Sequence, residues 1–273
     1  MSGEDKYLRS NRLPHILCPG CGHGIVMGAV VRAIEKAGLD QNKTVIVSGI
    51  GCSSRLPGYM DFDTLHTTHG RALAFATGIK FAKPELNVIV VTGDGDALAI
   101  GGNHFIHSCR RNIDITTIVL NNRIYGMTSG QFSPMTPQGH LATTAPFGNV
   151  DRDFDICELS KAAGATYVAR STAYHVAQLT DLVSKAIMNK GFSVVEAVSQ
   201  CPTYYGRRNK MGSAVDMMND QKASGVTAAA AAKLTPEQMV GKYVIGELHK
   251  AEAPEYTARY HSIVDSLKDK EMK

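Results

Sequence analysis

The sequence contains no apolar run that approaches the roughly 20 residues needed to cross a membrane. Its opening stretch, MSGEDKYLRSNRLPH, also lacks the apolar core of a secretion signal. Basic residues are scattered, and the densest group is only Arg207, Arg208 and Lys210, so nothing requires a nucleic acid. We therefore expect a cytoplasmic protein that binds neither membranes nor nucleic acids. Its net charge of +4 suits an acidic protein partner.

The composition indicates one large folded unit with an appendage. With 273 residues, of which 44% are hydrophobic and 20% charged, the chain is neither disordered nor fibrous, and it has no internal repeat. Buried strand patterns alternate with helical patterns, which predicts an α/β domain, 1–208, with a parallel sheet and helices on both faces. The remainder, 209–273, is predicted to be a C-terminal extension with helices at 236–251 and 254–269, packing on the domain or on a partner subunit.

The stretch from Val88 to Gly126 predicts one strand-helix-strand unit with polar residues at the strand ends. A right-handed crossover of this length brings two parallel strands to the same edge of a sheet, so Asp94 and Asn122 should face one crevice. Their oxygens, with a carbonyl of the turn, suit Mg2+, which often also binds a substrate's phosphates. Gly93 and Gly95 would let a diphosphate approach the backbone.

Four cysteines lie in Gly/Pro-rich loops that one parallel sheet can bring together. Cys18 and Cys21 form a CxxC at the start of a predicted helix, and Cys52 and Cys201 each follow a buried strand. A zinc ribbon needs a second CxxC about 15–20 residues on, which is missing, and a thioredoxin-like motif would follow a strand. A four-iron cluster fits the four loop positions, while zinc and a redox dithiol stay open.

Other cysteines and histidines could be taken for metal ligands, but a structural role explains them better. Cys109 and Cys157 fall inside predicted helices, where we expect buried core thiols. His104 and His107 are spaced i, i+3 on a helix and should pack or bond locally rather than bind a metal. The loop 125–148 exceeds the ~12–15 residues usual in a compact domain, so we expect it to be functional.

Six sequence blocks, in this order, resemble the β subunit of 2-oxoacid:ferredoxin oxidoreductases, most closely the 2-oxoglutarate type. The resemblance spans roughly residues 13 to 210 and includes the thiamine diphosphate motif, in which GDG is followed after a helix and a strand by NN. The blocks are CPGCGHG, GIGCSSR, HGRALAFATGIK, GDGDALAIGGNHFIHSCRRN, NNRIYGMTSGQFSPMTP and CPTYYGRRN.

The resemblance implies three groups of ligands and one substrate contact. The ligands of a [4Fe-4S] cluster would be Cys18, Cys21, Cys52 and Cys201, and those of Mg2+ would be Asp94, Asn122 and the carbonyl of Ile124. Thiamine diphosphate would contact Ile50, Gly51, Cys52, Ser53, His69, Gly95, Asp96, Gly126 and Met127. Arg55 stands where some relatives carry a basic residue that faces the distal carboxylate of the substrate; the alternative is a surface charge.

The resemblance also implies an activity and partners. The reaction would be reversible, coenzyme A-dependent oxidative decarboxylation of a 2-oxoacid, with 2-oxoglutarate converted to succinyl-CoA and CO2 and electrons passing through one cluster to ferredoxin. An α subunit would supply the pyrimidine-binding half of the site in an (αβ)2 assembly. Alternatives are pyruvate or broad 2-oxoacid specificity, a thiamine-dependent decarboxylase or synthase without a redox step, and a zinc-stabilised, non-catalytic interaction protein.

Overall fold

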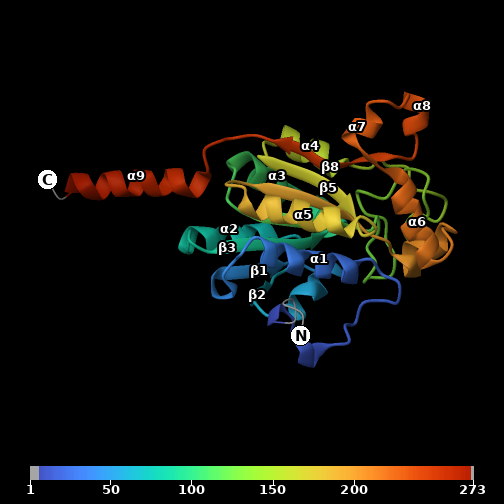
Figure 1. Cartoon of the computed structure of the whole chain (residues 1–273), viewed down its shortest axis with the longest axis horizontal. Helices are drawn as coiled ribbons and strands as arrows, with labels where there is room; N and C mark the ends of the chain where they lie inside the picture. Colours follow the sequence, from blue (N-terminus) through green and yellow to red (C-terminus); the bar gives the residue numbers. More distant parts are fainter. Residues whose placement is uncertain (1–5, 272–273) are drawn as a thin grey trace.

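A computed structural model describes residues 6–271, which form an α/β fold around an eight-stranded sheet (Figure 1). The strands follow the order β2-β1-β3-β4-β6-β5-β8-β7. Their bounds are β1 Thr44–Ser48, β2 Asp63–His66, β3 Asn87–Gly93, β4 Thr116–Asn121, β5 Tyr167–Thr172, β6 Ser193–Val198, β7 Gly225–Thr227 and β8 Tyr243–Lys250. Neighbours pair in parallel except β5 and β8, which are antiparallel. The α/β class predicted from the sequence is confirmed.

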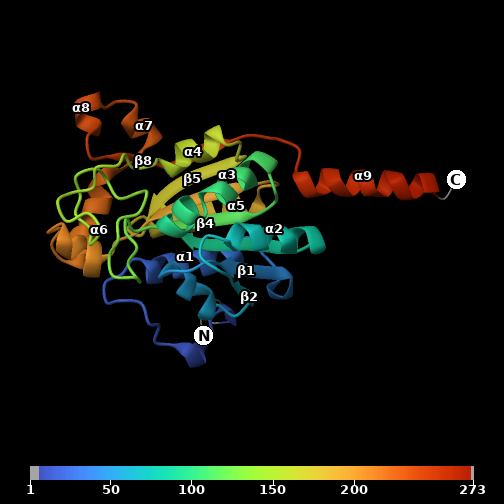
Figure 2. The same ribbon diagram turned by 180° about the vertical axis from the view of Figure 1, so that it is seen from behind.

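Helices cover both faces of the sheet, as the sequence pattern predicts. On one face, α1 (His23–Lys36) and α5 (Val176–Met188) pack their apolar sides against the strands (Figure 1). On the other face lie α2 (Ala72–Ala82), α3 (Gly102–Arg111) and α4 (Ile156–Ala162) (Figure 2). The central strands are therefore buried on both faces, which explains why they read as continuous apolar runs rather than as alternating patterns.

The unit predicted around the GDG and Asn-Asn turns is present near the middle of the sheet. β3 ends at Gly93, and the chain turns directly into a helical segment that includes η5 (Asp96–Ile100) and continues as α3. β3 and β4 pair in parallel, with Gly93 opposite Leu120. Asp94 and Asn122 therefore follow neighbouring strands at the same edge of the sheet, as predicted.

The C-terminal extension is only partly helical, so one of its two predicted helices is wrong. The stretch 236–251 forms the short helix α8 (Pro236–Met239) and then strand β8, which pairs with β5. This pairing with a strand far away in sequence outweighs the local helical pattern. The second predicted helix is present as α9 (Tyr256–Glu271), which projects from the body (Figure 1). Helices α6 (Ala214–Ser224) and α7 (Ala228–Ala231) precede them.

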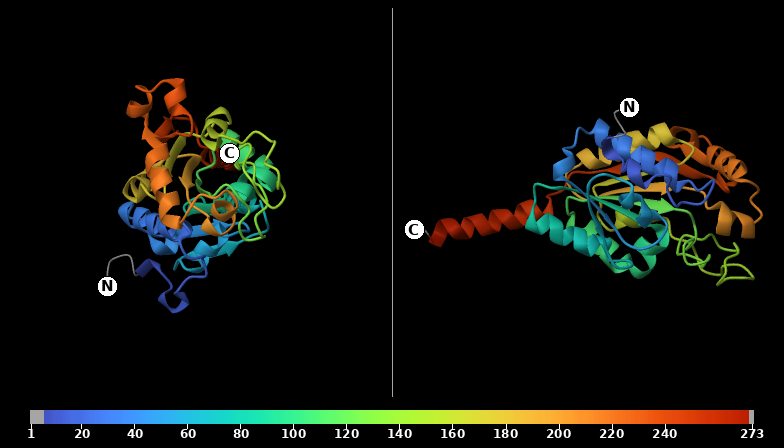
Figure 3. Two further views of the ribbon diagram at one scale, coloured as in Figure 1. Left: turned by 90° about the vertical axis from the view of Figure 1, so that its right-hand side faces the viewer. Right: turned by 90° about the horizontal axis from the view of Figure 1, so that it is seen from below.

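The long loop between β4 and α4 lies at the end of the molecule opposite α9 (Figure 3). This is the end at which the parallel strands finish, so the loop is placed to contribute to a site there. Within residues 6–271, no helix is both long and apolar enough to cross a bilayer. The domain boundary predicted after residue 208 stays a prediction.

Candidate functional site

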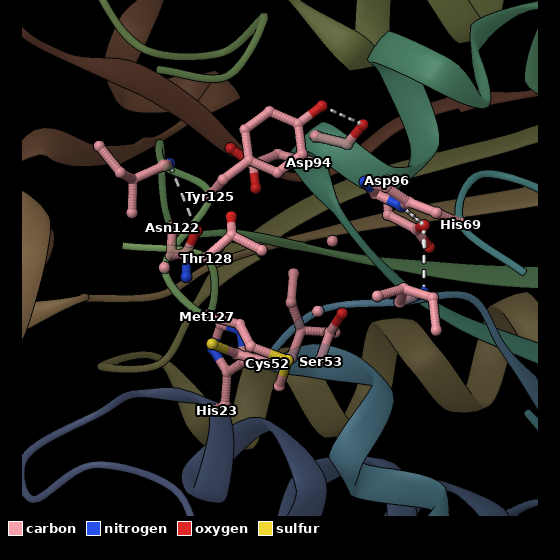
Figure 4. Close-up of a pocket in the computed structure, with 17 residues that line it drawn as sticks. His23, Cys52, Ser53, His69, Asp94, Asp96, Asn122, Tyr125, Met127 and Thr128 are labelled. Carbon is pink, nitrogen blue, oxygen red and sulfur yellow. Dashed lines mark hydrogen bonds and ion pairs between the residues drawn. The ribbon is translucent and has the colours of Figure 1, made fainter. Parts of the chain in front are cut away.

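A cavity of about 460 Å³ opens at the carboxyl ends of β1, β3 and β4, where parallel α/β sheets bind their ligands. All ten residues predicted to contact thiamine diphosphate, Gly93 included, line it, and so do the three predicted Mg2+ ligands. Figure 4 shows Asp94 and Tyr125 on one side of the cavity and Cys52 and Ser53 on the opposite side. Segments far apart in the sequence thus converge as predicted, although their ligand roles stay predictions.

Asp94 brings a buried carboxylate to this cavity without a basic partner among the described residues. Burial raises the pKa of its carboxyl to about 7. Ser133 donates a hydrogen bond to Oδ2 at 2.5 Å, which lowers this pKa but does not offset burial. The Oδ1 of Asn122 accepts only a long hydrogen bond, of 3.4 Å, from the amide of Ile124. Carboxylate, amide and carbonyl oxygens suit Mg2+, and a divalent cation would stabilise the charge that burial disfavours.

A turn in the long loop, residues 133–136, joins the two segments that carry these oxygens. The Oγ of Ser133 donates to the carboxylate of Asp94, and the amide of Ser133 donates to the Oγ1 of Thr136 at 2.8 Å. That hydroxyl in turn donates to the carbonyl of Arg123 at 2.5 Å. Ser133 and Thr136 are both buried. The loop expected to be functional therefore connects the end of β3 to the turn after β4.

The carboxylate of Asp96 holds two loops together rather than facing the cavity freely. Its Oδ1 accepts hydrogen bonds from the amides of Gly70 at 2.7 Å and Ile50 at 3.2 Å, and lies 2.5 Å from the Nδ1 of His69. A Cβ on Gly49 would lie 2.1 Å from Oδ2, so only glycine fits there. Protein donors therefore occupy this carboxylate, and the cofactor contact predicted for Asp96 stays a prediction.

Tyr125 forms part of the cavity wall that sequence reasoning missed. Its hydroxyl donates to the carbonyl of Gly95 at 2.9 Å, and burial raises the pKa of the phenol to about 12. A Cβ on Gly95 would lie 2.3 Å from the Tyr125 ring, which explains why the GDG turn needs glycine at this position. The position of Tyr125 directly after NNRI is a signal that could have identified it. The other lining residues that were missed are His23, Leu120 and Thr128.

His23 lies at the base of the cavity, directly after the CxxC segment. It is 1% exposed, and burial lowers the pKa of its imidazole to about 4, so it is neutral near pH 7. Its Nδ1 lies 3.1 Å from the Oγ of Ser199, which follows β6. His23 therefore links the start of α1 to the strand end that leads to Cys201.

A second cavity, of about 1110 Å³, adjoins the first and contains all four predicted cluster cysteines. Four residues line both cavities: Cys52, Asn122, Gly126 and Met127. A Cβ on Gly126 would lie 3.4 Å from the Sγ of Cys52 and 3.7 Å from the Sγ of Cys201. The structure therefore places thiols from distant segments beside the same glycine, as the cluster hypothesis requires.

The surroundings of Cys21 and Cys52 favour the protonated thiol unless a cation is bound. Burial raises the pKa of Cys21 to about 12 and of Cys52 to about 11, and neighbouring cysteines act in the same direction. The backbone amides of His23 and Met127 donate to these two sulfurs and oppose the rise. Coordination to a metal deprotonates a thiol outright. Within residues 6–271, no three His, Cys, Asp or Glu side chains are grouped to hold a single metal ion.

Arg55 lies at the rim of the cysteine cavity and of a third cavity, of about 780 Å³, that also contains Arg9 and Arg12. Its Nη2 lies 3.5 Å from the Nε2 of His66, and it forms no ion pair with a carboxylate in the described part of the chain. Burial and the Arg55 charge lower the pKa of His66. An exposed guanidinium without a carboxylate partner can accept one from a ligand.

The residues given simpler explanations lie away from both cavities. Cys109 in α3 and Cys157 in α4 are fully buried core thiols, which confirms that prediction. The Nδ1 of His107 accepts a hydrogen bond from the Nε of Arg110 at 3.2 Å, so the local bonding predicted for His107 is confirmed. These residues need no role in the site.

Comparison with known proteins agrees with this geometry. Residues 49–197 match the family described as "Thiamine pyrophosphate enzyme, C-terminal TPP binding domain". The chain is 54% identical to "2-oxoglutarate synthase subunit KorB" of Methanothermobacter marburgensis, over 97% of this chain and 93% of that protein. The chain belongs to the β-subunit family of 2-oxoacid:ferredoxin oxidoreductases. The resemblance read from the sequence is confirmed, and the chain is a subunit of a thiamine diphosphate-dependent oxidoreductase.

Further members of this oxidoreductase family show the same relationship. The protein of the same name from Archaeoglobus fulgidus is 61% identical over 72% of this chain and 74% of its own length. The solved structure of "2-oxoglutarate:ferredoxin oxidoreductase from Magnetococcus marinus with 2-oxoglutarate, coenzyme A and succinyl-CoA bound" superposes with a TM-score of 0.82 at 33% identity. That superposition covers 97% of this chain and 90% of the other.

Proposed function

We propose that this β subunit, together with an α subunit, catalyses the coenzyme A-dependent, reversible oxidative decarboxylation of 2-oxoglutarate to succinyl-CoA and CO2. Electrons would leave through a [4Fe-4S] cluster to ferredoxin. The observation that best supports this proposal is the wall shared by the first two cavities. Only Cys52, Asn122, Gly126 and Met127 would separate a cofactor in one cavity from a cluster in the other.

The first cavity fits thiamine diphosphate bound with Mg2+. Asp94, Asn122 and the carbonyl of Ile124 would hold the ion, and the backbone amides that follow Gly93 at the start of the helix would bind the diphosphate. The Oγ of Ser53 is buried and has no hydrogen-bond partner in the described structure, so a bound ligand would satisfy it. When bound, this cofactor supplies the carbon nucleophile that decarboxylation of a 2-oxoacid requires.

The second cavity fits a [4Fe-4S] cluster. The predicted ligands are Cys18, Cys21, Cys52 and Cys201. A cluster stands between its four thiolates, so it needs thiols placed around a space, whereas zinc needs them around one point. A cavity lined by all four thiols therefore favours the cluster. When bound, the cluster supplies one-electron transfer.

The rest of the proposal concerns substrate and partners. Arg55, which has no carboxylate partner within the described residues, would bind the distal carboxylate of 2-oxoglutarate, a group that pyruvate lacks. We infer that the α subunit supplies the pyrimidine-binding half of the thiamine site in an (αβ)2 assembly, because this chain matches one thiamine-binding domain. The cytoplasmic location stays a prediction.

The substrate can be tested with the co-expressed α and β subunits, purified anaerobically and assayed by viologen reduction. We expect 2-oxoglutarate to react faster than pyruvate or a branched 2-oxoacid. Arg55→Ala should lower kcat/KM for 2-oxoglutarate by roughly 10–100-fold, the effect of losing a hydrogen bond to a charged group, and spare pyruvate. Arg152→Ala, an exposed arginine outside these cavities, is the control. An unchanged preference in Arg55→Ala would remove Arg55 from the site.

The redox step is tested by Cys52→Ala, with Cys109→Ala in the core as its control. We expect Cys52→Ala to lose iron, acid-labile sulfide and viologen reduction, and Cys109→Ala to keep them. Release of CO2 that survives in Cys52→Ala would instead indicate a decarboxylase or synthase without a redox step. A colourless protein containing zinc would indicate a non-catalytic interaction protein. Turnover by the β subunit alone would contradict the need for an α subunit.

A further inference from the structure

A fourth cavity, of about 920 Å³, lies beyond the Asn-Asn turn and takes no part in the proposed reaction. It is bounded by that turn, by the long loop, by β5 and β6, and by residues 241–243 at the start of β8. The C-terminal extension thus completes its wall. The part of it that water could occupy measures about 370 Å³, within the range of about 300–1,000 Å³ common for small-molecule sites, so this cavity has the size of a ligand site.

Arg123 gives this cavity a guanidinium without a carboxylate partner among the described residues. It is partly buried, and its side chain forms a hydrogen bond with the hydroxyl of Tyr205. The nearby carboxylate of Glu196 is already occupied. Its Oε1 accepts from the Nδ2 of Asn121 at 2.7 Å, and its Oε2 accepts from the Nε of Arg170 at 2.5 Å. A partly buried cation without its own counter-ion is unfavourable, so this cavity favours an anion.

The other charges of the cavity do not supply that counter-ion. Arg170 bonds Asp155 at 2.6 Å as well as Glu196, so these two carboxylates are committed to it. Lys242 lines the cavity and forms no ion pair in the part of the chain that the structure describes. The remaining carboxylate, Asp153, is exposed at the rim. Two available cations, on Arg123 and Lys242, therefore outnumber the one available anion.

The backbone of Arg123 connects this cavity to the thiamine cavity. Arg123 has a φ of 63°, and its amide donates to the Oδ1 of Asn121 at 3.0 Å. The Arg123 side chain lines the fourth cavity, whereas its neighbours Asn122 and Ile124 line the first. A ligand bound to the guanidinium would therefore act on the same turn that carries two candidate Mg2+ ligands.

We propose that the fourth cavity binds a small oxyanion, a metabolite that presents a carboxylate or phosphate group to Arg123 and Lys242. A guanidinium can donate two parallel, charge-assisted hydrogen bonds to either group. The ligand would supply the missing counter-charge, and through the 121–124 turn its binding would be coupled to that of Mg2+. The site is separate from the proposed reaction, and its binding test requires neither thiamine diphosphate nor turnover.

The test is calorimetric titration of the co-purified α and β subunits with potassium phosphate and with potassium succinate, using potassium chloride to correct for ionic strength. We expect saturable binding of at least one anion. The anion that binds more tightly shows whether the cavity prefers phosphate or carboxylate. Arg123→Gln should weaken this binding by roughly tenfold or more, since it removes the charge and the bidentate donor. Arg259→Gln, an exposed arginine on α9, is the matched control and should bind like the unaltered protein.

Lys242→Gln provides a second variant in case Arg123→Gln does not fold, because Lys242 is exposed and makes no ion pair within the described residues. It should weaken the same binding by roughly threefold, as expected for a more exposed charge. Equal affinities in Lys242→Gln, Arg259→Gln and the unaltered protein would overturn the proposal. So would the lack of saturable binding of either anion, the result expected if an acidic side chain of the α subunit fills the cavity.

Discussion

Replacing Ser133 with alanine tests whether the long loop controls the proposed Mg2+ site. The hydroxyl of Ser133 donates to the Oδ2 of Asp94 at 2.5 Å, and both side chains are buried. Without it, the carboxylate keeps only its backbone hydrogen bonds and is less firmly oriented. Its pKa, which burial raises to about 7, rises further because the Ser133 hydrogen bond lowers it. Both effects weaken binding of a cation at neutral pH.

The size of the effect follows from the chemistry of this contact. A hydrogen bond to a charged group contributes about 1.5–3 kcal/mol, which corresponds to roughly 10–100-fold in affinity. Loss of a group that orients a metal ligand likewise costs roughly 10–100-fold in metal affinity. We therefore expect Mg2+ to bind Ser133→Ala about 10–100-fold more weakly than the unaltered protein at pH 7.

The assay is calorimetric titration of Mg2+ into the α and β subunits in the presence of saturating thiamine diphosphate. Ser129→Ala is the control, because Ser129 lies in the same loop and its exposed hydroxyl forms no hydrogen bond among the described residues. Thermal unfolding of both variants shows whether the fold is retained. If Ser133→Ala is folded and binds Mg2+ as tightly as Ser129→Ala does, the loop does not control the site.

Four further predictions concern charge and packing. Lowering the pH from about 8 to about 6 should weaken Mg2+ binding about tenfold, because the Asp94 carboxyl has a pKa of about 7 and must release its proton to bind the ion. Calorimetric titrations at both pH values check this, and equal affinities would contradict it. Without Mg2+, the free energy of unfolding should fall as pH rises from about 4 to about 7, because the native state keeps a proton on Asp94 that the unfolded state has lost. Gly49→Ala should cost about 1–3 kcal/mol in chemical denaturation, because its Cβ would meet Asp96; Gly58→Ala, where nothing lies within 4 Å, is the control. Glu196→Ala should lower the free energy of unfolding by about 3–5 kcal/mol, because it leaves the buried Arg170 poorly paired. Its control, Glu158→Ala, breaks an exposed ion pair and should cost less than about 1 kcal/mol.

The centre of the fold and most of the lining of the first cavity follow from local signals. The apolar runs of β3 and β4, the GDG turn and the Asn-Asn turn each mark an element boundary within a few residues. The right-handed crossover rule then places Asp94 and Asn122 at one edge without further information. The loops of Cys52 and Cys201 converge for the same reason, since each follows a strand that ends at that edge.

The remaining features depend on contacts between distant segments. In YVIGELHK, Tyr, Val and Ile favour a strand while Glu, Leu and Lys favour a helix, so pairing with β5 decides between the two. Likewise, the length of the loop indicated a function, but not that Ser133 would fold back to Asp94, which precedes it by 39 positions. Loops have no periodicity from which their path can be predicted.

The antiparallel pairing of β8 with β5 covers what would otherwise be an edge of the sheet. All six residues of β5 are buried, and β8 occupies the row of backbone amides and carbonyls along its outer side. β7, only three residues long, then closes the sheet with a short edge. A chain shortened at residue 208 would leave the outer side of β5 unpaired, an edge onto which strands of other chains can add. The extension thus guards against aggregation without supplying a catalytic residue.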